Sequence, residues 1–379
     1  MAVAVDGRCS DQFKAVKEVF ENNFSSGADL GASVAITING EMVVDLWGGH
    51  TDVEKTDLWQ ENTITNVYST TKTMSFLCAL VLADRGQLDF DAPVMKYWPE
   101  FAQNGKQIVL VWHIMNHSAG LSGMDVTVSE QDLYDWEKMT SLLAAQKPWW
   151  EPGTATAYHA LTQGYLIGEL VRRISGRSIG QFFRDEIAIP LQADFHIGVP
   201  ESEFPRICNL IPPGDDTSLQ VPGDPDSIAV RTFKNPSAKA LASRTTEWRK
   251  AEIPAANGHG NARSIARIHA NLACKGTANG VELFSAATAE SVMQERISGI
   301  DLAMDTPQRF GLGFGLNATE GPRLPNDNIC FWGGWGGSGV IIDQDAKMSI
   351  AYVMNKMDDG LSGDMRSGSL IMAAYRCLG

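Results

Sequence analysis

The stretch Ser69-Thr70-Thr71-Lys72 decides how this sequence is interpreted. It precedes an apolar segment that runs to Asp84 and is typical of a buried helix, with Gly86 as a stop at its C-terminal end. Residues three apart on a helix are neighbours, with about 5–6 Å between their Cβ atoms, so the amine of Lys72 can reach the hydroxyl of Ser69. The positive end of the helix dipole also favours negative charge on a serine at the helix start. The pattern predicts a nucleophile and its base; the alternative is an N-cap serine beside an exposed lysine.

Length and composition indicate a large globular chain with an excess of acidic residues. The 379 residues exceed the usual size of one domain, so two lobes or one elaborated domain are expected. A hydrophobic content of 44% with 20% charged residues supports a large core. The formal charge of −14 argues against nucleic acid and anionic membrane surfaces as partners, and it says little about a neutral organic substrate.

The sequence carries no targeting or metal-binding pattern. Residues 1–8 lack the basic and long apolar regions of a signal peptide, and no run of about eighteen apolar residues is present to cross a membrane. The six cysteines are scattered without paired metal-type spacing, and no histidine cluster has such spacing. We therefore expect a cytoplasmic protein with free thiols, no bound metal, no cofactor and no membrane association. The oligomeric state leaves no readable pattern.

A hairpin near the N-terminus and strand-like segments near the C-terminus enclose a helical middle. Asn39-Gly40, the strongest two-residue hairpin signal, separates strands at 33–38 and 41–46. Strands at both ends with helices between them indicate an α+β fold, in which one antiparallel sheet is built from both chain ends. The other predicted strands are 310–316, 329–332, 339–343 and 348–355. The predicted helices are 11–22, 71–84, 110–116, 132–145, 160–174, 179–186, 262–273 and 363–377.

This pattern divides the chain into two parts. Residues 1–68 together with 290–379 are expected to form a sheet domain flanked by helices, and residues 69–289 a mostly helical domain. Within the helical part, 190–255 is rich in proline, glycine and aspartate and has little periodicity. Long irregular segments of this kind often form a wall of an active site.

A second segment carries groups that suit acyl transfer. Tyr158 is predicted to open the helix at 160–174, where its phenol can hydrogen-bond Ser69 and relay a proton. His159 is expected to pack beside this tyrosine, and Tyr68 adjoins the nucleophile. The structural alternative for Tyr158 is a buried tyrosine with a satisfied hydroxyl.

Glycines crowd the segment from Trp332 to Gly339, on an otherwise apolar strand. Such density indicates close approach of a ligand or another backbone, or else a bulge. A strand whose N–H faces the nucleophile supplies half of an oxyanion hole, and the N–H of the nucleophile supplies the other half. We expect Trp335 to provide that N–H, with Trp332, Gly333 and Gly334 beside the substrate.

Together these motifs resemble the serine β-lactamase and penicillin-binding-protein superfamily, and in particular the class VIII esterases, which have the class C β-lactamase fold. The resemblance extends from about residue 30 to the C-terminus. It implies a serine carboxylesterase that acts on a small-molecule ester, with an acyl-enzyme on Ser69 and with Lys72 and Tyr158 handling the proton. The segments that carry it are 67–72, 151–153, 158–160, 170–178 and 257–263.

Two departures from the β-lactamase pattern bear on the substrate. Ala160 stands where Tyr-x-Asn would place an asparagine, and Trp332-Gly333-Gly334 stands in place of Lys-Thr-Gly. Both remove polar groups that hold the amide and carboxylate of a penicillin, which favours neutral short-chain or aromatic esters. An acyltransferase, or an amide or β-lactam hydrolase of the same fold, stays open, as does a binding protein on an inactive scaffold.

A second serine matches a different nucleophile motif. Gly176-Arg177-Ser178-Ile179-Gly180 fits the Gly-x-Ser-x-Gly elbow, which requires a strand before it and a helix after it. Here a predicted helix precedes the motif. We therefore expect Ser178 to be a helix N-cap rather than a nucleophile.

Overall fold

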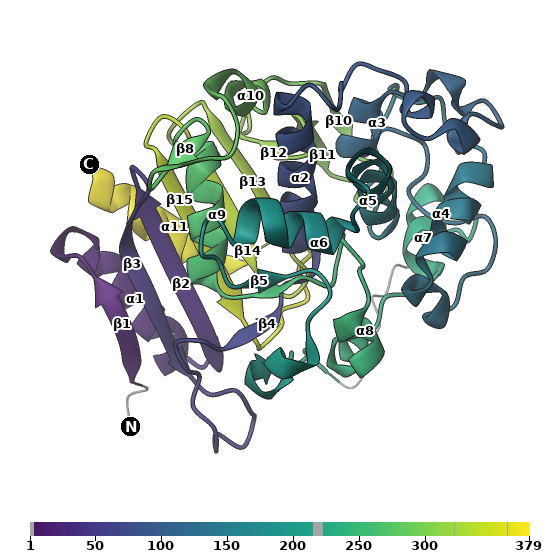
Figure 1. Cartoon of the computed structure of the whole chain (residues 1–379). Coiled ribbons are helices and arrows are strands. Elements are labelled where there is room, and N and C mark those ends of the chain that lie inside the picture. The colour runs from purple at the N-terminus through teal and green to yellow at the C-terminus, as the bar shows by residue number, and fades with distance from the viewer. Residues whose placement is uncertain (1–3, 215–222, 322, 362) are drawn as a thin grey trace.

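The computed structural model describes residues 4–214, 223–321, 323–361 and 363–379. Its main element is a nine-stranded antiparallel sheet that joins both ends of the chain (Figure 1). In order across the sheet, the strands are β1 (Val5–Cys9), β3 (Glu41–Gly49), β2 (Gly31–Ile38), β15 (Met348–Met354), β14 (Gly339–Asp343), β13 (Ile329–Gly333), β12 (Gly315–Leu316), β11 (Pro307–Phe310) and β10 (Ile297–Ile300). Asn39 and Gly40 join β2 to β3 with φ values of 51° and 86°, as a type I′ hairpin turn requires. The predicted α+β fold, with one sheet from both chain ends, is confirmed.

Helices cover both faces of this sheet. α1 (Lys14–Ser25) and α11 (Met365–Leu378) pack against each other on one face, and α9 (Ala262–Ala273) packs on β2 and β15 on the other (Figure 1). Because α9 lies within 69–289, the range expected to form the helical domain, the sheet also recruits a helix from that range. The remaining helices are α2 (Lys72–Asp84), α3 (Val111–Met115), α4 (Trp136–Ala145), α5 (Thr162–Ser175), α6 (Ile179–Phe183), α7 (Ile228–Lys234), α8 (Thr246–Lys250) and α10 (Ala286–Ser291).

The helix that follows the Ser69 turn runs through the interior. In α2 every residue from Lys72 to Leu82 is buried, and the helix packs against α5 and α6. A helix that is apolar on all sides is expected in such surroundings. The chain leaves α2 at Gly86, whose left-handed φ of 69° confirms the predicted stop. Among the described residues, none of the helices combines the length and apolar character needed to span a membrane.

One predicted strand is divided in the structure. The segment 310–316 forms the end of β11 and all of β12, and Phe310 pairs with Gly315 across a tight turn. At Gly313 the φ is 91°, and a Cβ there would lie only 2.6 Å from the ring of Phe76. Glycine permits this turn, and the glycines at 311, 313 and 315 in an otherwise apolar segment are of the kind that marks a bend. The irregular segment 190–255 contains short elements such as α7 and α8, and its residues 215–222 lie outside the described range.

Candidate active site

A strained turn presents Ser69. Strand β4 (Ile64–Asn66) ends just before it, and one 3₁₀ turn, Tyr68–Thr71, leads into α2. Tyr68 has a left-handed φ of 42°, which costs a bulky residue about 1–3 kcal/mol. The surroundings hold this conformation, because the ring is buried and its hydroxyl donates to the carbonyl of Ala240 at 2.9 Å. Ser69 follows directly and stays half-buried.

Lys72 lies one turn from Ser69 and is completely buried. Its Nζ bonds to the carbonyl oxygens of Ala160 and Ala255 at 2.7 and 2.9 Å and lies 3.1 Å from Ser69 Oγ. Burial holds the pKa of the amine well below its usual value, so the neutral form is favoured. A neutral amine has two N–H groups, which match the two carbonyls, and one lone pair, which is left for the hydroxyl of Ser69.

Tyr158 lies on the other side of Ser69. Its hydroxyl donates to Ser69 Oγ, and its ring centroid is 4.7 Å from Lys72 Nζ. Burial raises the pKa of the phenol well above its usual value, so Tyr158 is protonated at neutral pH. The structure therefore brings Ser69, Lys72 and Tyr158 together.

The backbone at Tyr158 differs from the expectation. Tyr158 does not open a helix, because α5 begins only at Thr162. The N–H groups of residues 157–159 bond instead to His117 and Asp301, which are distant in the sequence. These tertiary partners replace the hydrogen bonds that a first helical turn would need.

The glycine-rich segment after β13 lies against the Ser69 turn. A Cβ on Gly334 would collide with the carbonyl oxygen of Val67 and the hydroxyl of Ser338, so the close neighbour of this glycine is another part of the protein. Ser338 Oγ donates to the same carbonyl at 2.8 Å. Trp335 comes next and lines the cavity at Ser69. Among the described residues, neither the N–H of Ser69 nor that of Trp335 has a hydrogen-bond acceptor.

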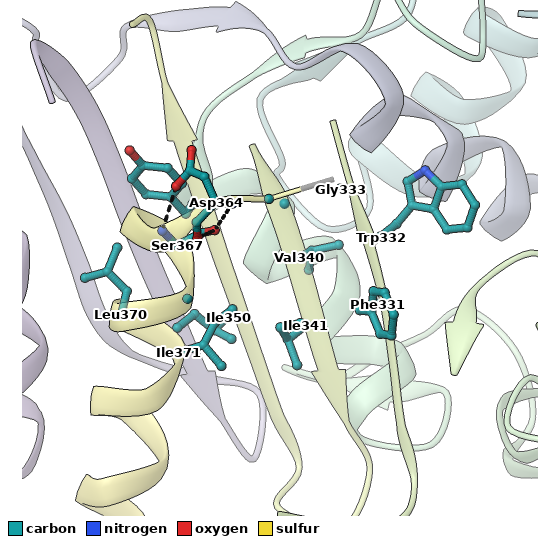
Figure 2. Close-up of a pocket in the computed structure, with 14 residues that line it drawn as sticks. Phe331, Trp332, Gly333, Val340, Ile341, Ile350, Asp364, Ser367, Leu370 and Ile371 are labelled. Carbon is teal, nitrogen blue, oxygen red and sulfur yellow. Dashed lines mark hydrogen bonds between the residues drawn. The ribbon is translucent and has the colours of Figure 1, made fainter. Parts of the chain in front are cut away.

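Trp332 and Gly333, which end β13 just before this segment, pack against parts of the protein other than the cavity at Ser69. Trp332 is only 8% exposed, stacks on the ring of His117 at 5.3 Å and meets the ring of Phe76 at 5.6 Å. Figure 2 shows its indole on the side of β13 that faces away from α11, and both Trp332 and Gly333 line a cavity of about 210 Å³ beside α11. In the described part of the chain, neither residue lines the cavity at Ser69. Of the four residues from Trp332 to Trp335, only Trp335 lines the described cavity at Ser69.

Comparisons with known proteins assign the chain to a family. A family model described as Beta-lactamase matches residues 18–369. The chain belongs to the beta-lactamase family. Among curated relatives, Esterase/beta-lactamase LipL of Mycobacterium tuberculosis is 33% identical over 363 residues, which cover 93% of this chain and 83% of that protein.

Solved structures of similar proteins match over nearly the whole chain. A family VIII carboxylesterase is 39% identical with a TM-score of 0.93, covering 99% of this chain and 100% of that one. A penicillin-binding protein homolog from Caulobacter crescentus is also 39% identical, with the same coverage and a TM-score of 0.92. The resemblance to the class VIII esterases that the sequence indicated is thereby confirmed, together with the β-lactamase-like fold.

His159 supports the backbone of this beta-lactamase-family site. Its Nε2 accepts the N–H of Leu121 at 3.2 Å, so Nδ1 carries the proton and donates to the carbonyl of Ala157 at 2.6 Å. Burial lowers the pKa of the imidazole to about 4, which keeps it neutral. Because both nitrogens are engaged, the ring has no lone pair to offer Ser69.

The cavity beside Ser69 is small and apolar. It has a volume of about 50 Å³, and none of its described lining residues carries a charge. It thus lacks the cation that Lys-Thr-Gly would contribute elsewhere in the beta-lactamase family. The carbonyls that hold Lys72 and the wall residues were not predicted, because backbone oxygens and scattered apolar side chains leave no motif. The unpredicted wall residues include Leu161, Phe233, Pro236, Trp248 and Leu361.

Ser178 is a helix N-cap, as predicted. A helix, α5, precedes it, and its Oγ accepts the N–H of Gln181 at 3.2 Å while donating to Glu252 at 2.6 Å. The motif therefore lacks the strand that a nucleophile elbow requires.

Proposed function

We propose that this member of the beta-lactamase family is a serine carboxylesterase that hydrolyses short-chain or aromatic esters through an acyl-enzyme on Ser69. One observation carries the proposal. Ser69 Oγ is hydrogen-bonded to the buried amine of Lys72 on one side and to the phenol of Tyr158 on the other. An alcohol with a neutral amine 3.1 Å away is an activated nucleophile.

In the acylation step Lys72 acts as the base. As Ser69 Oγ forms its bond to the ester carbon, its proton passes to Lys72 Nζ and the carbonyl oxygen becomes negative. The N–H groups of Ser69 and Trp335 stabilise this oxyanion, and loss of one such donor typically costs about 3–4 kcal/mol. Tyr158 then protonates the leaving alkoxide as the C–O bond breaks, and the Lys72 ammonium supplies the replacement proton.

Deacylation runs through the same groups with water in place of the alcohol. Lys72, neutral again after acylation, accepts the proton of the attacking water directly or with the phenol of Tyr158 as a relay, and the water oxygen bonds to the acyl carbon. The bond between that carbon and Ser69 Oγ breaks, Oγ regains a proton, and the carboxylic acid leaves. Ser69, Lys72 and Tyr158 are then back in the protonation states in which they started.

The apolar cavity supports neutral esters as the substrate class. A penicillin carries a carboxylate, and no cation lines the described cavity to pair with it. A second candidate is β-lactam hydrolysis, because LipL, the relative from Mycobacterium tuberculosis, is described as an esterase/beta-lactamase. We also propose a cytoplasmic location, which the six unpaired cysteines support.

A p-nitrophenyl ester series from acetate to octanoate, run beside nitrocefin and a p-nitroanilide, tests this function. We expect the highest kcat/KM for short acyl chains, with nitrocefin and the anilide much slower. Nitrocefin turnover equal to that of the best ester would establish the second candidate instead. Adding an alcohol and measuring how the acyl group divides between it and water distinguishes a hydrolase from an acyltransferase. A fluorophosphonate probe that fails to label Ser69 would contradict any serine mechanism.

A further inference from the structure

Tyr158 lies in a backbone stretch that has no helix or strand of its own, residues 155–159. Its neighbours on both sides bond to one residue. The N–H of Ala157 donates to the carbonyl of His117 at 3.0 Å, and the N–H of His159 donates to His117 Nδ1 at 2.9 Å. The N–H of Tyr158, which lies between these two, has a different partner.

That partner is the carboxylate of Asp301. Asp301 is completely buried and lies in the loop after β10. Its Oδ1 accepts the N–H of Tyr158 at 3.1 Å, and it accepts the N–H groups of Ala303 and Met304 at 3.0 and 2.9 Å. This one oxygen atom thus stabilises the turn at residues 301–304 and also binds the backbone N–H of Tyr158.

A second hydrogen bond joins the same two segments. The N–H of Leu302 donates to the carbonyl of Thr156 at 2.8 Å, so the loop is joined to the stretch on both sides of Ala157. A hydrogen bond to a charged acceptor is about twice as strong as one between neutral groups. The charge of Asp301 also helps to raise the pKa of Tyr158, which favours the phenol as a donor.

We infer that Asp301 is a positioning residue whose carboxylate fixes the backbone of Tyr158, so that the phenol hydroxyl meets Ser69 Oγ. This inference rests on the role of Tyr158 in the proposed function. Asp301 does not line the described cavity beside Ser69, so it acts through the tyrosine. A misplacement of about 1 Å can lower a rate by up to about 10²-fold. Loss of the carboxylate should therefore lower kcat and leave KM nearly unchanged.

The test is a double-mutant cycle with p-nitrophenyl acetate, in which kcat is normalised to active sites titrated with a fluorophosphonate. We expect Asp301→Ala to lower kcat about 10- to 100-fold in the wild-type background, with KM within about threefold. In the Tyr158→Phe background the same substitution should change kcat less than about threefold, because the group it positions is absent. Asp301→Asn keeps an acceptor oxygen, so its kcat should fall less than that of Asp301→Ala.

Asp343 provides a matched control. It is also a completely buried turn carboxylate, accepting the N–H groups of Asp345 and Ala346 at 2.9 and 2.8 Å, at the end of β14 away from Gly339. Asp343→Ala should lower stability and leave kcat per active site unchanged.

An unchanged kcat in Asp301→Ala, or an equal loss in both backgrounds, overturns the inference. If Asp301→Ala does not fold, Asp301→Asn is measured in the same two backgrounds. A decrease of about threefold or more that disappears with Tyr158→Phe then supports the inference, and a smaller or persistent decrease overturns it. Full activity of Tyr158→Phe alone would instead contradict the proposed function, so the two failures are distinguishable.

Discussion

The hydroxyl of Tyr158 donates a hydrogen bond to Ser69 Oγ, although 89 residues separate the two in the sequence. This bond sets the direction of the proton chain. Burial raises the pKa of the phenol and lowers that of the Lys72 amine, so in the proposed mechanism Tyr158 donates to Ser69 and Ser69 donates to Lys72. Under the proposed mechanism, Ser69 of the free protein is therefore already hydrogen-bonded to both groups that would handle its proton.

Ser69→Ala should abolish turnover of a short-chain p-nitrophenyl ester, with a loss of at least about 10³-fold in kcat, because no acyl-enzyme can form. Ser178→Ala is the control. It removes an N-cap worth about 1 kcal/mol and should lower the melting temperature slightly without changing kcat. Activity retained in Ser69→Ala would overturn the assignment of the nucleophile.

Lys72→Met should remove activity and also change how stability depends on pH. The unfolded lysine keeps its usual pKa of 10.5, while the folded one has a pKa well below it, so the unfolded state binds more protons between these two values. The free energy of unfolding of the wild type therefore rises with pH across this window, by up to about 1.4 kcal/mol per pH unit. The methionine variant lacks this contribution. Urea unfolding of both proteins should be measured at several pH values from 7 to 10. The free energy of unfolding of the wild type should rise relative to that of the variant as the pH rises. A difference that stays constant with pH would mean that Lys72 is charged when folded.

Gly334→Ala should lower kcat by at least about tenfold, because the new Cβ would push the Trp335 segment away from the Ser69 turn and weaken the oxyanion contacts. Gly368 in α11 is the matched control, since a Cβ there meets nothing within 4 Å. Gly368→Ala should stabilise the helix by up to about 1 kcal/mol and leave kcat unchanged. Equal kinetics in the two variants would argue against an oxyanion role for this segment.

Phe233→Ala should shift the acyl-chain preference toward longer esters, because the ring forms a wall of the cavity of about 50 Å³. Each added methylene that becomes buried is worth about 0.8 kcal/mol, or about fourfold in kcat/KM. Phe284, which is 1% exposed and does not line that cavity, is the control for a plain loss of packing. If the chain-length profile of Phe233→Ala matches that of Phe284→Ala, the cavity does not receive the acyl group.

The parts of the site that the sequence predicted are those set by local geometry. The spacing of Ser69 and Lys72 on a helix, the turn at Asn39-Gly40 and the helix stop at Gly86 each depend on a few adjacent residues, and all three appear in the structure. The backbone at Tyr158 was predicted wrongly, because its N–H bonds to Asp301, 143 residues away.

Other features left no pattern for the same reason. The carbonyls of Ala160 and Ala255 that receive the amine of Lys72 belong to the backbone, which any residue type provides. The turn that divides the apolar segment 310–316 packs Gly313 against the ring of Phe76, far away in the sequence. Contacts of this kind follow from the folded chain and not from spacing.

Strand β2 lies between β3 and β15, so one of its neighbours is synthesised directly after it and the other much later. The β2–β3 hairpin emerges from the ribosome early. The other edge of β2 has no strand to pair with until β15, which ends at Met354, has emerged. β13, which leads into the Trp335 segment, joins the sheet through β14 and β15. The nascent chain can therefore bring the Trp335 segment against the Ser69 turn only after these strands have emerged, and a product that ends before β13 would carry Ser69 and Lys72 without that segment.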